Sequence, residues 1–138
     1  MQNCTCFNLR KTTRVVTQLF DEALKPCGIY ATQFTLLVAI SSQKKIAITE
    51  LSKVLVMDRT TLTRNLKPLQ KNGWVEVLPG EDKRTKTLSL TSSGKRILKR
   101  AMIYWKKIQD QVVRALGQGN WEFLLENLAS TVKKLKRV

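Results

Sequence analysis

The stretch from residue 57 to residue 74, MDRTTLTRNLKPLQKNGW, predicts an amphipathic helix that begins after an N-cap at Asp58. Projection at about 100° per residue places its three leucines, at positions 62, 66 and 69, on one face. The opposite face carries cations and hydroxyls and no acid: Thr60, Arg64, Lys67 and Lys71, with Thr61 and Thr63 beside them. A solvated face usually mixes both signs of charge, so this face is better suited to binding an anion.

These side chains have the chemistry of a helix that enters the major groove of DNA. Arginine can bind guanine through two hydrogen bonds, lysine supplies charge to phosphates, and threonine can contact phosphate oxygens or the thymine methyl group. We therefore predict a recognition helix over residues 58–71 whose DNA-binding residues are Arg59, Thr60, Thr61, Thr63, Arg64, Lys67 and Lys71.

Pro68 lies near the end of this helix and leaves the carbonyl of Arg64 without its intrahelical partner. Because it follows the residues that would read bases, the first half of the helix is expected to keep its regular geometry. We predict a modest bend at Pro68 that turns Lys67 and Lys71 toward phosphates.

The neighbouring segments predict a winged helix-turn-helix. Before the basic helix, Thr49 is expected to cap a short helix from Glu50 to about Val54, which follows a strand fragment at residues 45–48. After it, residues 74–78 and 87–90 alternate as two strands around the turn-rich segment 79–84. The basic tip of this hairpin would approach the DNA backbone or minor groove, and it contains Lys83, Arg84 and Lys86.

Helices with apolar stripes are predicted on both sides of this lobe. One runs from about residue 8 to residue 24, and a shorter one capped by Thr32 runs to Ile40. Two long ones follow, one with Thr91 as its N-cap and one after Asn120. One alternative is that these helices simply pack against their own domain. However, a monomer of 138 residues could hardly cover all the apolar stripes. We therefore expect an intertwined homodimer whose two recognition helices lie roughly 34 Å apart and read an inverted repeat.

The expected fold class is mainly α with a small β-wing. Residues 1–138 would form a single domain, in which segments 8–30 and 92–138 supply the dimerisation helices and residues 32–91 form the winged DNA-binding lobe.

The composition also indicates a polyanionic partner. The chain has 25 Lys and Arg against 10 Asp and Glu, a net charge of +15, which suits nucleic acid or an anionic membrane. The alternative is thus a basic membrane-surface or scaffold protein that uses the cationic segment 133–137, although membrane binding would not require a wing. Neither a secretory signal nor an apolar run of ~20 residues is visible, so we expect a cytoplasmic protein without a membrane partner.

Histidine is absent from the sequence. This removes histidine-based catalytic triads, histidine-ligated metal sites and the commonest general base. We therefore expect neither an enzyme nor a resident metal ion or cofactor.

The hairpin and the start of the next helix resemble the MarR family of bacterial transcriptional regulators. The family's wing pattern, Asp-x-Arg-x-x-x-Leu-x-Leu-Thr-x-x-Gly, is matched by Asp82, Arg84, Leu88, Leu90, Thr91 and Gly94. Residues 58–64 and 72–75 are similar to the family's recognition helix and its exit. The resemblance implies a homodimer that binds a short palindrome. Such a dimer usually represses transcription until an effector alters its half-site geometry. It also implies that Arg84 reaches the minor groove while Asp82 holds the wing through an ion pair.

Three cysteines raise the separate question of what regulates the protein. The segment from Cys6 to Leu9 resembles the OhrR branch of the family, in which a cysteine at this position is oxidised, so Cys6 is a candidate redox sensor, with Cys4 and Cys27 as further candidates. The sequence departs from that branch at Arg10 and Phe20, where tyrosines are expected.

Other roles for these thiols stay open. They could bind a soft metal ion, or they could be small residues packed in an interface. The effector could equally be a small molecule, as in relatives that respond to phenolic compounds.

Overall fold

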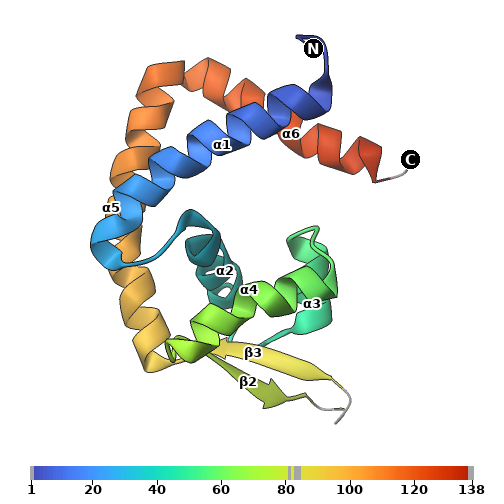
Figure 1. Ribbon diagram of the computed structural model, residues 1–138, viewed down its shortest axis with the longest axis vertical. Helices are drawn as coiled ribbons and strands as arrows, with labels where there is room; N and C mark the ends of the chain where they lie inside the picture. Colours follow the sequence, from blue (N-terminus) through green and yellow to red (C-terminus); the bar gives the residue numbers. More distant parts are fainter. Residues whose placement is uncertain (1, 81, 83–84, 137–138) are drawn as a thin grey trace.

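A computed structural model describes residues 2–80, 82 and 85–136 of the chain. Its elements are, in order, α1 (Thr5–Leu24), a 3-10 turn (Lys25–Cys27), α2 (Ala31–Ser41), β1 (Ile46–Ala47), α3 (Ile48–Val54), α4 (Arg59–Lys71), β2 (Val75–Pro79), β3 (Lys86–Leu90), α5 (Ser92–Leu116) and α6 (Gln118–Leu135). Figure 1 shows α3, α4 and the β2–β3 hairpin at one end, α1 and α6 at the other, and α5 running between the two ends. The predicted winged helix-turn-helix is confirmed.

The sheet is small and antiparallel, with strand order β1-β3-β2. Val75 pairs with Leu90, and Val77 pairs with Leu88, so alternate residues of the hairpin turn toward the core. Ile46 of β1 lies opposite Leu88 on the other side of β3. These side chains join a buried cluster with residues of α2 and α4, which anchors the wing to the rest of the lobe.

The amphipathic pattern of α4 is confirmed, because Leu62, Leu66 and Leu69 are all buried. Asp58 is the N-cap, as predicted. The helix continues through Pro68 to Lys71, so the proline does not end it. The bend expected at Pro68 stays a prediction.

Helix α2 begins differently from the prediction that Thr32 caps it. It starts at Ala31, because Asp21 of α1 accepts the Ala31 N–H at 2.7 Å and the Gln33 side chain accepts the Tyr30 N–H at 3.0 Å. The carboxylate of Asp21, ten residues earlier in the chain, therefore accepts one of the backbone N–H groups that lack a partner in the first turn of α2.

Three other helix starts were also wrong. Helix α1 begins at Thr5 rather than near residue 8, and α3 begins at Ile48, so that Thr49 lies inside it. Helix α6 begins at Gln118, before Asn120, because Gly117 takes a positive φ of 82° and redirects the chain there.

One junction ties the end of α4 to the start of α5. Thr91 donates its backbone N–H to the carbonyl of Trp74 at 3.0 Å and its hydroxyl to the carbonyl of Gly73 at 2.6 Å, while its hydroxyl oxygen accepts the Gly94 N–H at 3.0 Å. Gly94 packs so closely that a Cβ atom there would overlap the Trp74 carbonyl oxygen. We call these four residues the Thr91 junction.

Among the described residues, no single helix has both the length and the apolar content to cross a membrane. Residues 5–27 and 31–41 meet these criteria only as a pair of helices bent by 76°.

Gly94→Ala is expected to destabilise the protein by about 2 kcal/mol or more, because the added methyl group has to displace backbone atoms. Urea denaturation followed by circular dichroism measures the effect. The control is Gly119→Ala on α6, where a Cβ meets nothing within 4 Å and the free energy of unfolding should stay equal or rise slightly. Equal urea midpoints for Gly94→Ala and the parent would contradict this account of the junction.

Candidate nucleic-acid interface

The N-terminus of α4 is fixed by its capping residue. Asp58 accepts the Thr61 backbone N–H at 2.8 Å through Oδ1 and the Thr61 hydroxyl at 2.6 Å through Oδ2. These bonds, the side-chain one first, lower the pKa of the Asp58 carboxyl group below its ordinary value. Thr61 is half-buried and its hydroxyl proton is engaged in the cap, so the structure gives it a capping role beside its predicted role at DNA.

The other predicted residues of the recognition helix are all exposed: Arg59, Thr60, Thr63, Arg64, Lys67 and Lys71. They form two rows along α4. By helical spacing, residues 60, 64, 67 and 71 lie opposite the buried leucines, whereas residues 59 and 63 lie toward the wing. The Thr63 hydroxyl donates to the Arg59 carbonyl at 2.8 Å, which leaves its methyl group and the two lone pairs of its oxygen for a partner.

None of the cations on α4 forms an ion pair with another described residue. The ion pair found in the described part of the chain joins Lys25 and Glu22, at the end of α1, with 3.6 Å between Nζ and Oε1. No described residue therefore neutralises the positive charge of α4, which faces solvent.

The wing tip is closed by backbone hydrogen bonds. Gly80 donates its N–H to the carbonyl of Thr85 at 2.8 Å, and Thr85 donates its N–H to the carbonyl of Asp82 at 2.8 Å. Asp82 and Lys86 are exposed. The predicted tip residues Lys83 and Arg84 lie outside the described residues. The ion pair expected of Asp82 stays a prediction.

A cleft of about 540 Å³ separates α4 from the wing and from α3. Its floor is apolar, and its polar lining comes from three elements: Thr49 of α3, Arg59, Thr63 and Gln70 of α4, and Thr85 and Lys86 at the wing. The structure thus brings two predicted residues of the helix, Arg59 and Thr63, together with the predicted wing residue Lys86.

The sequence prediction missed Thr49, Gln70 and Thr85 in this cleft. Gln70 follows Thr63 by seven residues, which is two helical turns, so helical spacing could have placed it on the same row. Thr49 and Thr85 carried no comparable signal, because only the tertiary packing of α3 and the wing brings them to α4.

The cysteines do not meet within one protomer. Cys4 and Cys6 are exposed at the start of α1, whereas Cys27 is buried beyond its other end. A helix of 20 residues separates the two positions by roughly 30 Å. The suggestion that three thiols of one chain hold a metal ion was therefore wrong, and the described residues contain no group of three potential ligands.

Cys27 also lacks the surroundings of a reactive thiol. Burial raises the pKa of the Cys27 thiol above its ordinary value, an effect that outweighs the opposing charge of Arg100. The structure therefore leaves Cys4 and Cys6 as the accessible thiols among the three.

Comparison with known proteins gives consistent matches. The model of the MarR family matches residues 29–86. The multiple antibiotic resistance protein MarR of Escherichia coli is 42% identical over 82% of this chain and 72% of its own length, and the transcriptional regulator SarZ of Staphylococcus haemolyticus is 34% identical over 81% and 74%. The crystal structure of the M. tuberculosis transcriptional regulator MosR in complex with DNA superposes with a TM-score of 0.90 at 32% identity, covering 98% of both chains.

The fold and its cationic helix define the class of winged-helix DNA-binding proteins. With the similarities in sequence and structure added, the chain belongs to the MarR family. It is a DNA-binding transcriptional regulator.

Asp58→Ala should lower the stability of the protein at neutral pH, because it removes the cap of α4. The folded protein lowers the pKa of Asp58, so the carboxylate stabilises the fold above the ordinary aspartate pKa of about 3.9, and this stabilisation is lost as the pH falls through the lower, folded value. Thermal unfolding should therefore show a gap between parent and variant at pH 7 that narrows toward pH 3. Asp110→Ala, at an exposed position of α5, is the control and should show no such pH-dependent gap; a constant gap for Asp58→Ala would argue against the cap.

Proposed function

We propose that the protein binds a palindromic operator as a homodimer and represses transcription from it. The cationic face of α4, which forms no ion pair with a described residue and continues across the 540 Å³ cleft to Lys86 of the wing, is the observation that carries this proposal. In this arrangement α4 enters the major groove, with Arg59, Thr60, Thr61, Thr63, Arg64, Lys67 and Lys71 available for contacts. The wing, with Asp82, Lys83, Arg84 and Lys86, lies against the backbone or the minor groove. Such a regulator acts where the DNA is, which places it in the cytoplasm.

The proposed dimer forms through the two ends of the chain. No described residue of α6 is buried, although the helix carries several large apolar side chains that are exposed: Phe123, Leu124, Leu125, Leu128, Val132 and Leu135. An apolar groove of about 510 Å³ runs between α1, α5 and α6. A second copy would cover these surfaces, because so large an apolar area is rarely left to water. Segments 8–30 and 92–138 are thus the dimerisation helices, and residues 32–91 form the DNA-binding lobe.

The proposed regulator is released from DNA by a signal, for which two routes are open. One is oxidation at the exposed thiols of Cys4 and Cys6. The other is a small molecule bound in the cavity of about 480 Å³ between α1, α2 and α5, where the dimerisation helices meet the DNA-binding lobe.

Arg64→Ala should relax the sequence preference of DNA binding, because its guanidinium would contact base edges. Arg84→Ala should weaken binding to all sequences more uniformly. Selection of bound sequences from a random library, followed by affinity measurements at several salt concentrations, separates the two effects. Arg114→Ala, at an exposed position near the end of α5, is the matched control and should change neither. The opposite ranking of Arg64 and Arg84 would overturn the assignment of helix and wing.

Leu128→Lys is expected to shift the protein from dimer to monomer, since the charge would enter the apolar groove of α6. Sedimentation velocity at micromolar concentration measures the change, and binding to a full palindrome should fall with it. Glu126→Lys places the same lysine side chain on the same helix at an exposed position outside the groove, and it should remain dimeric. A dimeric Leu128→Lys protein would place the interface elsewhere.

Cys6→Ser tests the oxidative route. If Cys6 is the sensor, the variant should keep its DNA binding after treatment with peroxide under conditions that release the parent protein. Cys27→Ser, at the buried thiol, should respond like the parent. Loss of DNA binding by Cys6→Ser to the same extent as the parent would exclude Cys6 as the sensor.

A further inference from the structure

The outer face of α5 carries a concentration of positive charge that the proposed function does not use. Residues 92–109 of this helix contain six cations and no acid, whereas α4 contains four cations. By helical spacing, the six lie on the side of the helix opposite the buried Gly94, Ala101 and Ile108. All six are exposed, and we call them the α5 cations: Lys95, Arg96, Lys99, Arg100, Lys106 and Lys107.

The charge of this face is neither neutralised by a described residue nor favourable for α5 itself. None of the α5 cations forms an ion pair within the described part of the chain. Lys95 and Lys99 are four residues apart, as are Arg96 and Arg100, and like charges at this spacing lower the stability of a helix. The pattern therefore indicates a negatively charged partner outside the protomer.

Two of the α5 cations are held in place by neighbouring groups. Arg100 donates from Nη2 to the carbonyl of Pro26 at 2.9 Å, and its side chain remains exposed. The Nζ atom of Lys107 lies 5.9 Å from the centroid of the Tyr104 ring. Side chains that are already ordered lose less conformational entropy when a partner binds.

Near the start of α5, the cations border an open hollow of about 790 Å³ between the end of α2, the β2–β3 hairpin and α5. Lys44 joins Lys95 and Lys99 there, against a single acid of the lining, Glu76. The serine hydroxyls of the lining donate within the protein, all at 2.7 Å: Ser41 to the Val38 carbonyl, Ser42 to the Ala39 carbonyl and Ser89 to Glu76. The lysine ammonium groups are therefore the main donors in the hollow, and they supply charge to phosphates without selecting a sequence.

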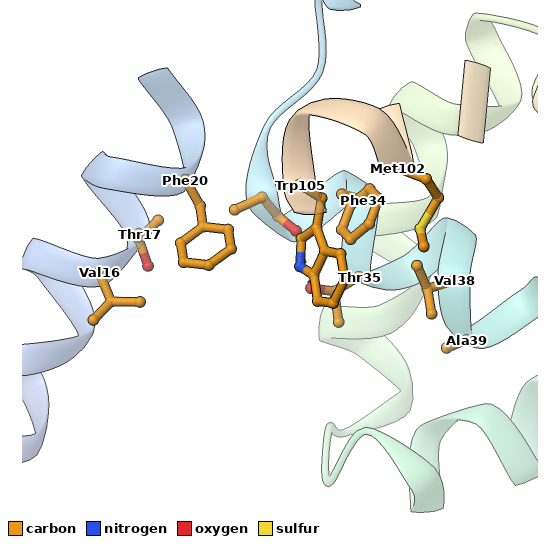
Figure 2. Close-up of a pocket in the computed structure, with 10 residues that line it drawn as sticks. Val16, Thr17, Phe20, Phe34, Thr35, Val38, Ala39, Met102 and Trp105 are labelled. Atoms are coloured by element: carbon orange, nitrogen blue, oxygen red, sulfur yellow. Dashed lines mark hydrogen bonds between the residues drawn. The ribbon is translucent and has the colours of Figure 1, made fainter. Parts of the chain in front are cut away.

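Duplex DNA is the polyanion that fits this face best. From Lys95 to Lys107 the cations extend roughly 18 Å along α5, and a duplex of this length carries about ten phosphates. A protein partner fits less well, because protein interfaces are poor in lysine and rich in aromatic and apolar anchors. Among the described residues of this face, Ile103 is the exposed large apolar side chain, since Figure 2 shows Met102 with Val38 beside the cavity between α1, α2 and α5.

The same charges disfavour two other occupants. A membrane surface would require apolar side chains that insert beside the cations, and a single isoleucine does not supply them. A second copy of this chain has a net charge of +15, so it would be repelled from this face. We therefore expect the α5 cations to stay exposed in the proposed dimer.

The operator cannot cover the α5 cations by itself. Figure 1 shows α5 leading away from α4 and the hairpin toward α1 and α6. A duplex held against α4 and the wing therefore reaches the first turns of α5 at most.

We propose that the α5 cations bind the phosphates of a second DNA segment, without reading its sequence, while α4 holds the operator. Each protomer has one such face, so a dimer on its operator connects two segments of DNA. The proposal rests on the proposed function only for the operator at α4.

Retention of a second duplex on operator-coated beads tests this proposal. The full-length protein is bound to beads that carry the operator sequence selected from the random library, unbound protein is washed away, and a fluorescent duplex of unrelated sequence is added. The labelled duplex stays on the beads only if the bound protein holds two duplexes at once. We expect the parent protein to retain it, with an affinity that falls as the salt concentration rises.

Two matched variants locate the second contact. Arg96→Glu with Lys99→Glu reverses two of the α5 cations, whereas Lys11→Glu with Arg14→Glu reverses an exposed lysine and arginine of the same spacing on α1, outside its apolar groove. The α5 variant should bind the second duplex at least about 10-fold more weakly and reduce the slope of log affinity against log salt by about two, while the α1 variant should change the affinity by less than about 3-fold. Each new glutamate on α5 lies four residues from a remaining α5 cation, so thermal unfolding should show this variant to be at least as stable as the parent.

Two results of the bead assay would overturn the proposal: no retention by the parent, or equal retention by the two variants. Competition tests the other class of partner. Poly-glutamate that displaces the labelled duplex at a lower charge concentration than unlabelled duplex DNA would assign the face to an acidic protein, and it would also overturn the proposal.

Operator affinity, measured by fluorescence anisotropy without a second duplex, separates this proposal from the proposed function. The two variants have the same net charge and should bind the operator equally. Operator binding without retention of a second duplex would keep the proposed function and overturn only this proposal. A protein that binds no operator would overturn the proposed function, and the affinities of the two variants for the unrelated duplex would then still test the α5 cations.

Discussion

The Thr91 junction is the constraint on which the arrangement of this protein depends. Thr91 donates its backbone N–H to the Trp74 carbonyl beside the sheet and its hydroxyl to the Gly73 carbonyl after α4. Its hydroxyl oxygen also caps α5. Because Gly94 lets the first turn of α5 pack directly against the Trp74 backbone, the exit of α4 and the start of α5 are in close contact. This contact leaves little room for the two helices to move relative to each other. The orientation of α4 is thereby set relative to α5, and through α5 relative to the helices that would join two protomers.

The cations of the candidate nucleic-acid interface and the exposed apolar surface are separated along the molecule, and α5 connects the two regions. These exposed cations lie on α4 and beside the wing, whereas exposed apolar side chains lie on α1 and α6, at the other end of α5 (Figure 1). A membrane-surface protein would be expected to present both properties on one face, since its apolar side chains insert beside its cations. The separation fits a regulator that binds a polyanion at one end and a second copy at the other.

The cavity between α1, α2 and α5 lies where these two ends meet. Its walls come from elements to which we assign separate tasks, so a molecule bound there would be placed to affect their relative position. The exposed thiols lie at the far end of α1, while the third thiol is buried close to where α1 turns into α2. The two candidate signals therefore act at different ends of the same helix, which makes them separable by substitution.

The sequence by itself determined the features that depend on near neighbours along the chain. The Asp58 and Thr91 caps, the buried leucines of α4 and the hairpin behind it follow from local spacing, and the structure confirms them. Only the tertiary structure decided the start of α2, because its cap comes from Asp21 on another helix. The same holds for the cleft at Thr49 and Thr85 and for the burial of Cys27, since each depends on which distant segment packs alongside. Periodicity indicates which face of an element is buried, but it does not indicate which other element covers that face.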